Sequence, residues 1–320
     1  MALVMDMGGN WIRVALVSHE GEVLWRERKR TKGQEASPRV LARVDELLQR
    51  GMARVGDGKL AGIGMGLAGP VDPETGIMYD PPNIPSLDGV SLKELWSARV
   101  ECPVLAGNDA TLAALGEYRY GSGMGARTLV YLTISTGIGG GVVIDGRPLM
   151  GANGMAGELG HMTIDRNGPR CKCGNVGCLE ALASGTAIAE RARGRLEEGE
   201  PSLMLDIVSG DQSQISSETV FAAAVGGDSM AKDILDDVAR ALGAGLVNVL
   251  HIFNPDVIVV GGGVSNHWKY LRPMVRSYID AHAMSHVRKL GFRLSVSSLG
   301  DNIGLLGAAA LVWSEARELG

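Results

Sequence analysis

The chain is patterned as two copies of one plan, in which an apolar strand runs into a glycine turn and further strands follow. The first copy predicts strands over 3–7, 11–18 and 23–29, with Gly8–Gly9 in the first turn. The second copy begins with an apolar strand expected over 128–135, which also enters a glycine-rich turn. The repeat predicts an α/β fold of two similar lobes that duplicate a βββαβα plan, with a cleft between them.

Helical and further strand segments complete both copies. Apolar residues at helical spacing, such as Val40, Val44 and Leu48, predict a helix over 37–54. The polar stretch 195–216 is expected to be a mobile loop or a short helix, and the glycine run predicts a turn over 136–141. The other predictions are strands over 60–67, 104–106, 141–145 and 257–260, and helices over 109–120, 179–195, 218–225, 229–253, 267–283 and 303–318.

The length and composition favour a soluble globular protein with two lobes. A chain of 320 residues exceeds what one simple core accommodates, and 45% apolar with 21% charged residues is ordinary for such proteins. A net charge of −5 argues against nucleic acid as a partner. The N-terminus lacks the pattern of a secretion signal. The longest apolar stretch, 242–253, is interrupted by Asn248 and His251, so we expect no membrane span.

Three of the four cysteines and a histidine cluster in the sequence. Cys171, Cys173 and Cys178 lie within eight residues, and His161 precedes the first of them by ten. One imidazole and three thiolates are a complete tetrahedral ligand set for zinc. Clustered cysteines of this kind indicate a metal site in a reducing compartment, so we expect a cytoplasmic protein. Three glycines allow a tight knuckle there: Gly168, Gly174 and Gly177.

This cluster reads as a histidine followed, after nine residues, by the pattern CxCGxxGCxE. It resembles the signature of the ROK family of sugar kinases and sugar-responsive repressors. Within it the chain is most similar to ATP-dependent glucokinases of bacteria and archaea. Four more motifs follow the family's order: DMGG at 6–9, GLAGPVD at 66–72, GNDA at 107–110 and STGIGGG at 135–141. The resemblance implies the actin-like, hexokinase-like ATPase fold. It also implies a small lobe of residues 1–107 plus about 304–320, and a large lobe of residues 108–303 that carries the knuckle, 161–180.

The turn after the first strand is a candidate for binding the phosphates of ATP. Gly8, Gly9 and Asn10 could present backbone N–H groups to phosphate oxygens, and Asp6 could hold hydrated Mg²⁺. An ordinary hairpin turn would show the same glycine pair. The family usually has threonine where this chain has Asn10.

Two later glycine segments are candidates for the nucleotide as well. Thr136, Gly137, Gly139 and Gly140 form the second phosphate loop, and it matches neither a Walker nor a Rossmann pattern. The resemblance implies that the turn at Gly262 and Gly263 binds adenosine, although a plain strand-to-helix connection would have the same sequence.

Asp109 follows Asn108 at the expected start of a helix, where either residue could serve as a cap. The resemblance implies instead that Asp109 is the general base, which accepts the proton of a sugar hydroxyl attacking the γ-phosphate. The family usually has glutamate where this chain has Gly107. The sugar-binding residues implied by the resemblance are Asn83, Asn108, Asp109, Glu158, His161 and Glu180, whose side chains suit the hydroxyls of a pyranose.

The metal expected at His161 and the three cysteines is structural, because its four ligands leave no open position. If one ring nitrogen of His161 binds zinc, the other can meet a sugar hydroxyl. We therefore expect transfer of the γ-phosphate of ATP to O6 of a hexose, glucose first. An N-acetylhexosamine kinase, such as one for N-acetylmannosamine, remains open, and so does a phosphate donor other than ATP.

A sugar-responsive repressor is the alternative from another class. Repressors of the family carry an added N-terminal DNA-binding module, and the strand expected from Leu3 leaves no room for one. We expect the partners to be a small sugar and other copies of the chain, in a dimer or tetramer, and neither nucleic acid nor a membrane.

Overall fold

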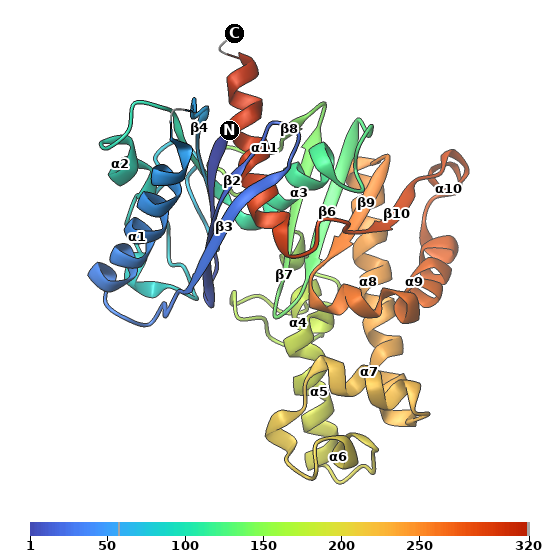
Figure 1. Ribbon diagram of the computed structural model, residues 1–320. Coiled ribbons are helices and arrows are strands. Elements are labelled where there is room, and N and C mark those ends of the chain that lie inside the picture. The colour runs from blue at the N-terminus through green and yellow to red at the C-terminus, as the bar shows by residue number, and fades with distance from the viewer. Residues whose placement is uncertain (57, 319–320) are drawn as a thin grey trace. The chain divides into compact units, whose positions relative to one another are not determined.

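The computed structural model describes residues 1–56 and 58–318, and two five-stranded sheets organise it (Figure 1). The first sheet has the order β3-β2-β1-β4-β5. Its strands are β1 (Ala2–Met7), β2 (Trp11–Val17), β3 (Val23–Arg30), β4 (Gly62–Leu67) and β5 (Val104–Asn108).

The second sheet repeats this order. It consists of β6 (Thr128–Ile134), β7 (Ile138–Ile144), β8 (Arg147–Pro148), β9 (Val257–Gly261) and β10 (Arg293–Val296). Read from β8, the order is β8-β7-β6-β9-β10, so the first strand of each set is central, with the second and third on one side and the fourth and fifth on the other. The duplication predicted from the sequence is therefore confirmed.

The connections in the first sheet follow from strand direction. The short turns after β1 and β2 give antiparallel neighbours, in which Asp6 pairs with Arg13 and Arg13 pairs with Arg28. The strands β4 and β5 run parallel to β1, and parallel pairs need a crossover connection. The crossovers contain α1 (Ser37–Val55) and α2 (Leu92–Ser97).

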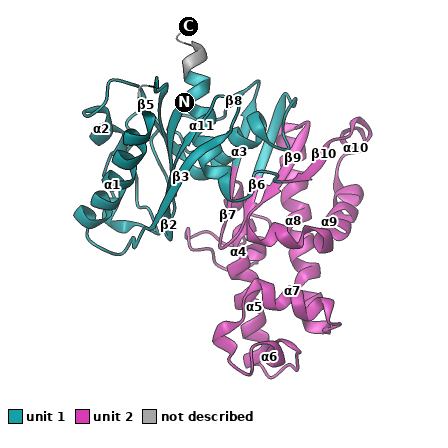
Figure 2. Ribbon diagram, in the orientation of Figure 1, with its two compact units in different colours: residues 1–131, 141–157, 297–320 teal, residues 132–140, 158–296 magenta. Residues whose placement is uncertain are grey.

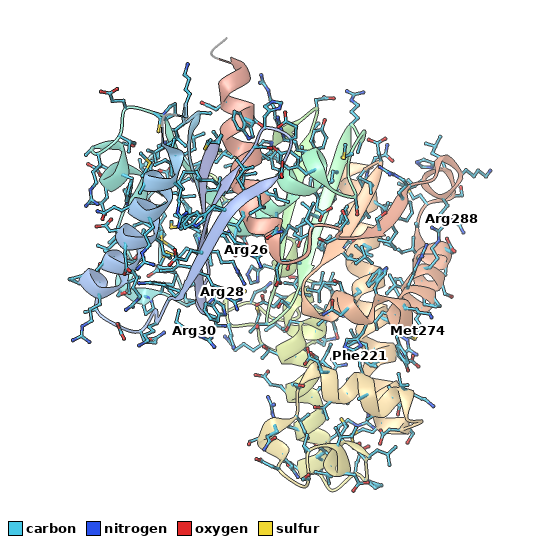
Figure 3. The ribbon with its side chains drawn as sticks, viewed as in Figure 1. Arg26, Arg28, Arg30, Phe221, Met274 and Arg288 are labelled. Carbon is cyan, nitrogen blue, oxygen red and sulfur yellow. The ribbon has the colours of Figure 1, made fainter. Side chains whose placement is uncertain are left out.

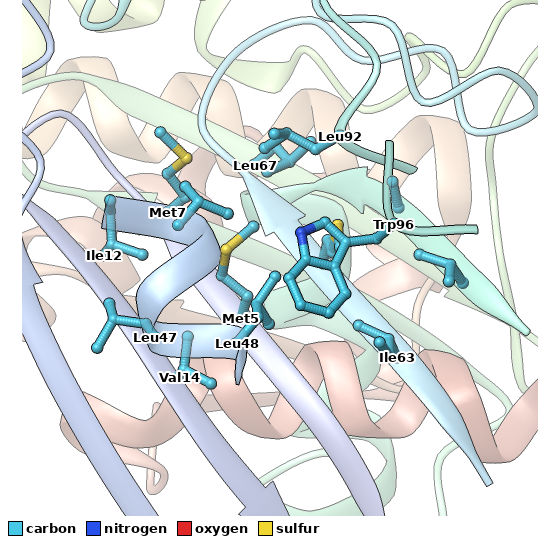
Figure 4. Close-up of a cluster of buried hydrophobic side chains, with 14 of the residues drawn as sticks. Met5, Met7, Ile12, Val14, Leu47, Leu48, Ile63, Leu67, Leu92 and Trp96 are labelled. Carbon is cyan, nitrogen blue, oxygen red and sulfur yellow. The ribbon is translucent and has the colours of Figure 1, made fainter. Parts of the chain in front are cut away.

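The first sheet is covered on both faces. On one face, Met5 and Met7 of β1 pack with Leu47 and Leu48 of α1 and with Trp96 of α2, all of them buried (Figure 4). On the other face lie α3 (Asp109–Tyr120) and α11 (Ile303–Glu318), and α11 packs against α3, β1 and β4. A face covered by apolar side chains is the main source of stability for such a sheet.

The chain divides into two compact units (Figure 2). The first comprises Met1–Tyr131, Gly141–Gly157 and Ser297–Gly320, and the second comprises Leu132–Gly140 and Glu158–Val296. The division therefore falls within β6 and β7, and α3 belongs with α11 in the first unit. The lobe boundary expected at 107/108 stays a prediction.

The helices of the second unit are α4 (Leu179–Ala183), α5 (Gly185–Glu197), α6 (Met204–Ile207), α7 (Ser217–Val225), α8 (Ser229–Phe253), α9 (Trp268–His282) and α10 (Ser285–Leu290). Short 3₁₀ turns lie at Pro85–Leu87, Leu159–His161, Gln212–Gln214, Gly263–His267 and Gly300–Asn302. The helix predicted over 229–253 is confirmed to the residue. Of the two alternatives for 195–216, the structure has the short helix, α6. No helix in the described part of the chain is long and apolar enough to cross a membrane.

Two predicted elements need correction. The helix expected over 179–195 is interrupted at Ser184, which is extended and whose hydroxyl caps α5 by accepting from Ala187 N–H at 3.1 Å. The glycine turn expected over 136–141 is shorter, because β7 begins at Ile138 and includes Gly139, Gly140 and Gly141. A Cβ at Gly141 would lie 2.8 Å from the Ala110 carbonyl, so close packing against α3 explains the glycine there.

Candidate active site and metal centre

The four predicted metal ligands lie together in the second unit. The ligand atoms of His161, Cys171, Cys173 and Cys178 are all within 4.8 Å of one another. His161 Nδ1 is 3.7 Å from Cys171 Sγ, and the sulfurs of Cys173 and Cys178 are also 3.7 Å apart. A tetrahedral zinc with Zn–S bonds of about 2.3 Å separates its sulfurs by about 3.8 Å. The cluster is therefore compatible with a four-coordinate cation.

The knuckle that holds these ligands depends on tight backbone turns. Short β-bridges join Thr163 to Cys178 and Arg170 to Val176. Gly177 has a φ of +70° and contacts the carbonyl of Asp165 where a Cβ would have to lie. A side chain at Gly177 would displace the segment that carries Cys178.

The charges and hydrogen bonds around the sulfurs also suit a cation. Burial raises the pKa of the Cys171 thiol to about 12 and raises the pKa of Cys178 as well, whereas the backbone N–H of Asn175 lowers the pKa of the exposed Cys173. Asn175 Nδ2 also donates to Cys178 Sγ at 3.4 Å. A bound cation offsets the cost of burying thiolates, so this donor set fits a metal better than it fits free thiols.

Two carboxylates flank the cluster, and they do different things. Glu180 Oε2 accepts the backbone N–H of Ile138 at 2.9 Å and contacts the position that a Cβ on Gly137 would occupy, while its Oε1 lies 3.8 Å from Cys171 Sγ. Glu158 is half exposed, and its Oε2 lies 3.9 Å from His161 Nε2. The ring of His161 thus presents Nδ1 to the sulfurs and Nε2 to Glu158.

Thr136, Gly137, Gly262 and Gly263 of the second unit lie near the end of β6. Ser135 N–H donates to the Gly137 carbonyl at 2.8 Å, which closes a tight turn containing Thr136. Gly185 N–H donates to the Ser135 carbonyl at 2.7 Å. Gly262 has a φ of +84° and lies against the Ile134 carbonyl, with Gly263 next to it. The turn predicted to bind phosphate and the turn predicted to bind adenosine therefore meet at the same strand end.

The glycine turn of the first unit lies between β1 and β2. Gly8 N–H donates to the Trp11 carbonyl at 3.0 Å, and the Thr31 hydroxyl donates to the Gly8 carbonyl at 2.6 Å. A Cβ on Gly9 would lie 2.6 Å from Cβ of Asn83, so the structure brings these two candidates into contact. Only glycine permits this approach of the turn to Asn83.

Asp6 is paired with a residue that sequence reasoning missed. Its Oδ2 accepts from Arg13 Nη1 at 2.8 Å, and its carboxyl lies against Gly304 at the start of α11. Burial raises the pKa of Asp6, and the charge and hydrogen bond of Arg13 oppose this shift. The signal for Arg13 in the sequence is a single charge in the otherwise apolar strand WIRVALV.

Asn108 is the last residue of β5, and Asp109 is the first residue of α3. Asn108 is the cap, because its Oδ1 accepts from Ala110 N–H at 2.9 Å and from Thr111 N–H at 3.1 Å. Its Nδ2 donates to the Gly69 carbonyl at 3.0 Å. Asp109 occupies the first helical position, with Oδ1 2.8 Å from Ala110 N. The ambiguity over which residue caps the helix is settled in favour of Asn108.

The candidate residues divide between the units. The first unit holds Asp6, Gly8, Gly9, Asn10, Asn83, Asn108 and Asp109, and the second holds Thr136, Gly137, Gly139, Gly140, Glu158, His161, Cys171, Cys173, Cys178, Glu180, Gly262 and Gly263. Gly139 and Gly140 lie in β7, so of the second phosphate loop only Thr136 and Gly137 belong to the turn itself.

Comparison with known proteins identifies the family. The model of the ROK family matches residues 2–315, and the chain belongs to that family. It is 35% identical to a glucokinase of Halalkalibacterium halodurans, covering 96% of this chain and 93% of that protein, and 36% identical to a glucokinase of Thermotoga maritima, covering 96% of each. A ROK family glucokinase from Streptomyces griseus, solved with glucose and AMPPNP, superposes with a TM-score of 0.81 at 30% identity, covering 98% of this chain and 99% of that one. The predicted actin-like, hexokinase-like fold is confirmed.

Proposed function

We propose that this protein is an ATP-dependent hexokinase that transfers the γ-phosphate to O6 of glucose. The glucokinases that it resembles align over nearly the full length of both chains. Within the structure, the observation that carries the proposal is the cap of α3. Asn108 accepts the N–H groups of both Ala110 and Thr111, and Asp109 only shares the first of them, so capping does not require an aspartate at the first helical position.

In the proposed reaction, Asp109 accepts the proton from the O6 hydroxyl as that oxygen attacks the γ-phosphorus. The bond between the γ-phosphorus and the bridging oxygen of ADP breaks, and ADP leaves. Such transfer requires positioning, neutralisation of phosphate charge and one group that takes the proton. A carboxylate in the first turn of a helix is stabilised by the helix dipole.

The glycine turns supply the proposed phosphate contacts. Backbone N–H groups at Gly8–Asn10 and at Thr136–Gly137 are the candidate donors, and Gly262–Gly263 is the candidate adenosine contact. Asp6 is the candidate for holding Mg²⁺ through water, because Arg13 occupies only its Oδ2. The metal ion, when bound, would neutralise charge on the phosphates.

The knuckle has a structural part in this proposal. Zinc would be held by His161, Cys171, Cys173 and Cys178, with no ligand position left for water or sugar. Sugar hydroxyls would then meet His161 Nε2, Glu158 and Glu180 in the second unit, and Asn83 and Asn108 in the first. The metal acts by fixing the ring of His161 and the segment that leads to Glu180.

A coupled assay of ADP release across hexoses and N-acetylhexosamines tests the function. We expect glucose to give the highest kcat/KM, with Asp109→Asn as the inactive control. A higher kcat/KM for N-acetylmannosamine than for glucose would show that the protein is an N-acetylhexosamine kinase. Sugar binding by calorimetry without ADP release from any sugar would contradict the kinase and favour a sensor. The predicted dimer or tetramer can be checked on the same samples by light scattering.

A further inference from the structure

The strand β3 presents two different faces. Residues Glu27 and Lys29 point toward α1, where they form ion pairs with Arg50 and Glu46. The alternate residues Arg26, Arg28 and Arg30 are exposed and follow one another along the strand (Figure 3). Side chains alternate between the faces of a strand, so these three arginines share the face opposite α1.

Two of these arginines are held by an aromatic ring. The guanidinium carbon of Arg28 lies 4.3 Å from the ring centroid of Trp11, and that of Arg30 lies 4.1 Å from it. Both distances are well inside the range of cation–π attraction. Arg26 is engaged elsewhere, because its Nη1 donates to Asn302 Oδ1 at 2.8 Å.

The pair of charges on Trp11 has no counter-charge. Among the side chains that the structure describes, in residues 1–56 and 58–315, no carboxylate forms an ion pair with Arg28 or Arg30. The nearest acid in the strand register, Asp6, is paired with Arg13. Two like charges on one indole repel each other, in a protein whose net charge is −5. An anion placed between the two guanidinium groups would relieve that repulsion.

The pair adjoins the glycine turn of the first unit. Trp11 directly follows Asn10, and Arg30 is its partner in the strand register. The next residue along, Thr31, donates its N–H to the Asn10 carbonyl at 3.0 Å and its hydroxyl to the Gly8 carbonyl. Hydrogen bonds from Thr31 therefore join the strand end that carries Arg30 to the turn.

We propose that Arg28 and Arg30, braced on Trp11, form a binding subsite for a phosphate chain that is continuous with the turn at Gly8–Asn10. The proposal rests on the proposed function and adds residues to its donor site. Guanidinium groups bind phosphate through paired N–H donors, and stacking on Trp11 restricts both side chains before the ligand arrives. The ligand class is a chain of several phosphates, whether it belongs to a nucleotide or is inorganic.

A protective role is the competing explanation, because natural edge strands often carry Lys or Arg to prevent pairing with other chains. β3 is an edge strand, so this role would explain exposed arginines without any ligand. It does not explain the stacking of two of them on Trp11. It predicts that neutral variants aggregate while their affinity for phosphate chains is unchanged.

The test uses inorganic tripolyphosphate, which has the phosphate chain but no adenosine. We compare the wild type with the double variant Arg28→Gln/Arg30→Gln, and use Arg26→Gln as the control on the same strand. At saturating glucose, we expect tripolyphosphate to compete with ATP. In the double variant, its inhibition constant and the KM for ATP should both rise about tenfold, with kcat and the KM for glucose unchanged. In Arg26→Gln these constants should stay within about twofold.

Further measurements separate the explanations. The double variant Arg28→Lys/Arg30→Lys keeps the positive charges but loses the paired N–H donors. It should therefore recover only part of the affinity for tripolyphosphate. If the enzyme phosphorylates glucose with tripolyphosphate as donor, the subsite binds an inorganic phosphate chain. If tripolyphosphate only competes with ATP and is not used, the subsite binds the phosphate chain of the nucleotide. If the wild type proves not to use ATP, calorimetric binding of tripolyphosphate still tests the subsite. Equal affinities in wild type and double variant, with both folded by circular dichroism, would overturn the proposal.

Discussion

The two glycine turns of the duplicated fold are supported by different chemistry. In the first unit, neutral groups hold the turn, with the Thr31 hydroxyl on the Gly8 carbonyl and the Gly8 N–H on Trp11. In the second unit, backbone bonds at Ser135 are joined by a charged group, because the carboxylate of Glu180 accepts the N–H of Ile138. The other oxygen of that carboxylate lies 3.8 Å from Cys171, a predicted zinc ligand.

The comparison shows that duplication preserved the strand order but not the means of support. Among the residues that the structure describes, the hydrogen bonds of the first turn come from its own backbone and from Thr31, and none involves the knuckle. A turn held in part through Glu180 depends on the knuckle, and we expect the knuckle to depend on the zinc proposed for it. We therefore expect metal dependence to fall on the second turn and to leave the first unaffected.

The largest expected effect is on the chemistry of the first unit. Asp109→Asn keeps the size of the side chain and leaves the Asn108 cap in place, but it cannot accept the proton. We expect kcat to fall about 100- to 10,000-fold. Glucose affinity and zinc content should be retained, because the amide has the size of the carboxylate and can still form hydrogen bonds. Near-normal kcat in a rapid-quench or coupled assay would show that another group takes the proton.

The second-largest effect is expected from loss of zinc, which should weaken glucose binding by residues of the second unit. Cys173→Ser is expected to reduce zinc, measured by elemental analysis, to well below one ion per chain. The KM for glucose should rise by about 10- to 100-fold, as His161 and Glu180 lose their fixed positions. The control is Cys102→Ser, which changes the one cysteine outside the cluster. Full zinc content in Cys173→Ser would remove that residue from the ligand set.

A side chain at Gly137 should disturb the second turn without removing the metal. A Cβ there overlaps Glu180 Oε2, so Gly137→Val must push the carboxylate off Ile138. We expect the KM for ATP to rise about tenfold or more and the KM for glucose to rise with it, at normal zinc content. The counterpart Gly9→Val displaces Asn83 in the first unit and should raise the KM for ATP as well. Unchanged ATP kinetics in both variants would exclude the turns as phosphate sites.

The smallest effects are expected from changing the side chain that holds each turn, Glu180 in the second unit and Thr31 in the first. Glu180→Gln keeps an acceptor for Ile138 but removes the charge, and Thr31→Val removes the hydroxyl from Gly8. Each change should cost about 1 kcal/mol, or about fivefold in KM. We expect Thr31→Val to affect ATP alone, whereas Glu180→Gln should affect ATP and glucose together. Identical patterns in steady-state kinetics would mean that the two supports do not differ in function.

Much of the fold could be predicted because it depends on local patterns. Apolar spacing located α1 and α8, and apolar runs that lead into glycine turns located both central strands. The interruption at Ser184 and the early start of β7 were missed. The hydroxyl of Ser184 favours a new cap over a continued helix, and sheet pairing extends a strand through glycines that look like a turn.

The sequence by itself determined the duplicated strand plan, and it predicts the metal ligand set and Asp109 as the base, because these depend on residue type and short spacing. Only the tertiary structure decided which groups support them. The bond between Ile138 and Glu180 joins residues 42 apart, and the pairing of Asp6 with Arg13 depends on the register of two strands. The stacking of Arg28 and Arg30 on Trp11 likewise requires β3 to lie beside β2. Contacts of this kind follow from how the chain packs, and no local pattern of residues specifies them.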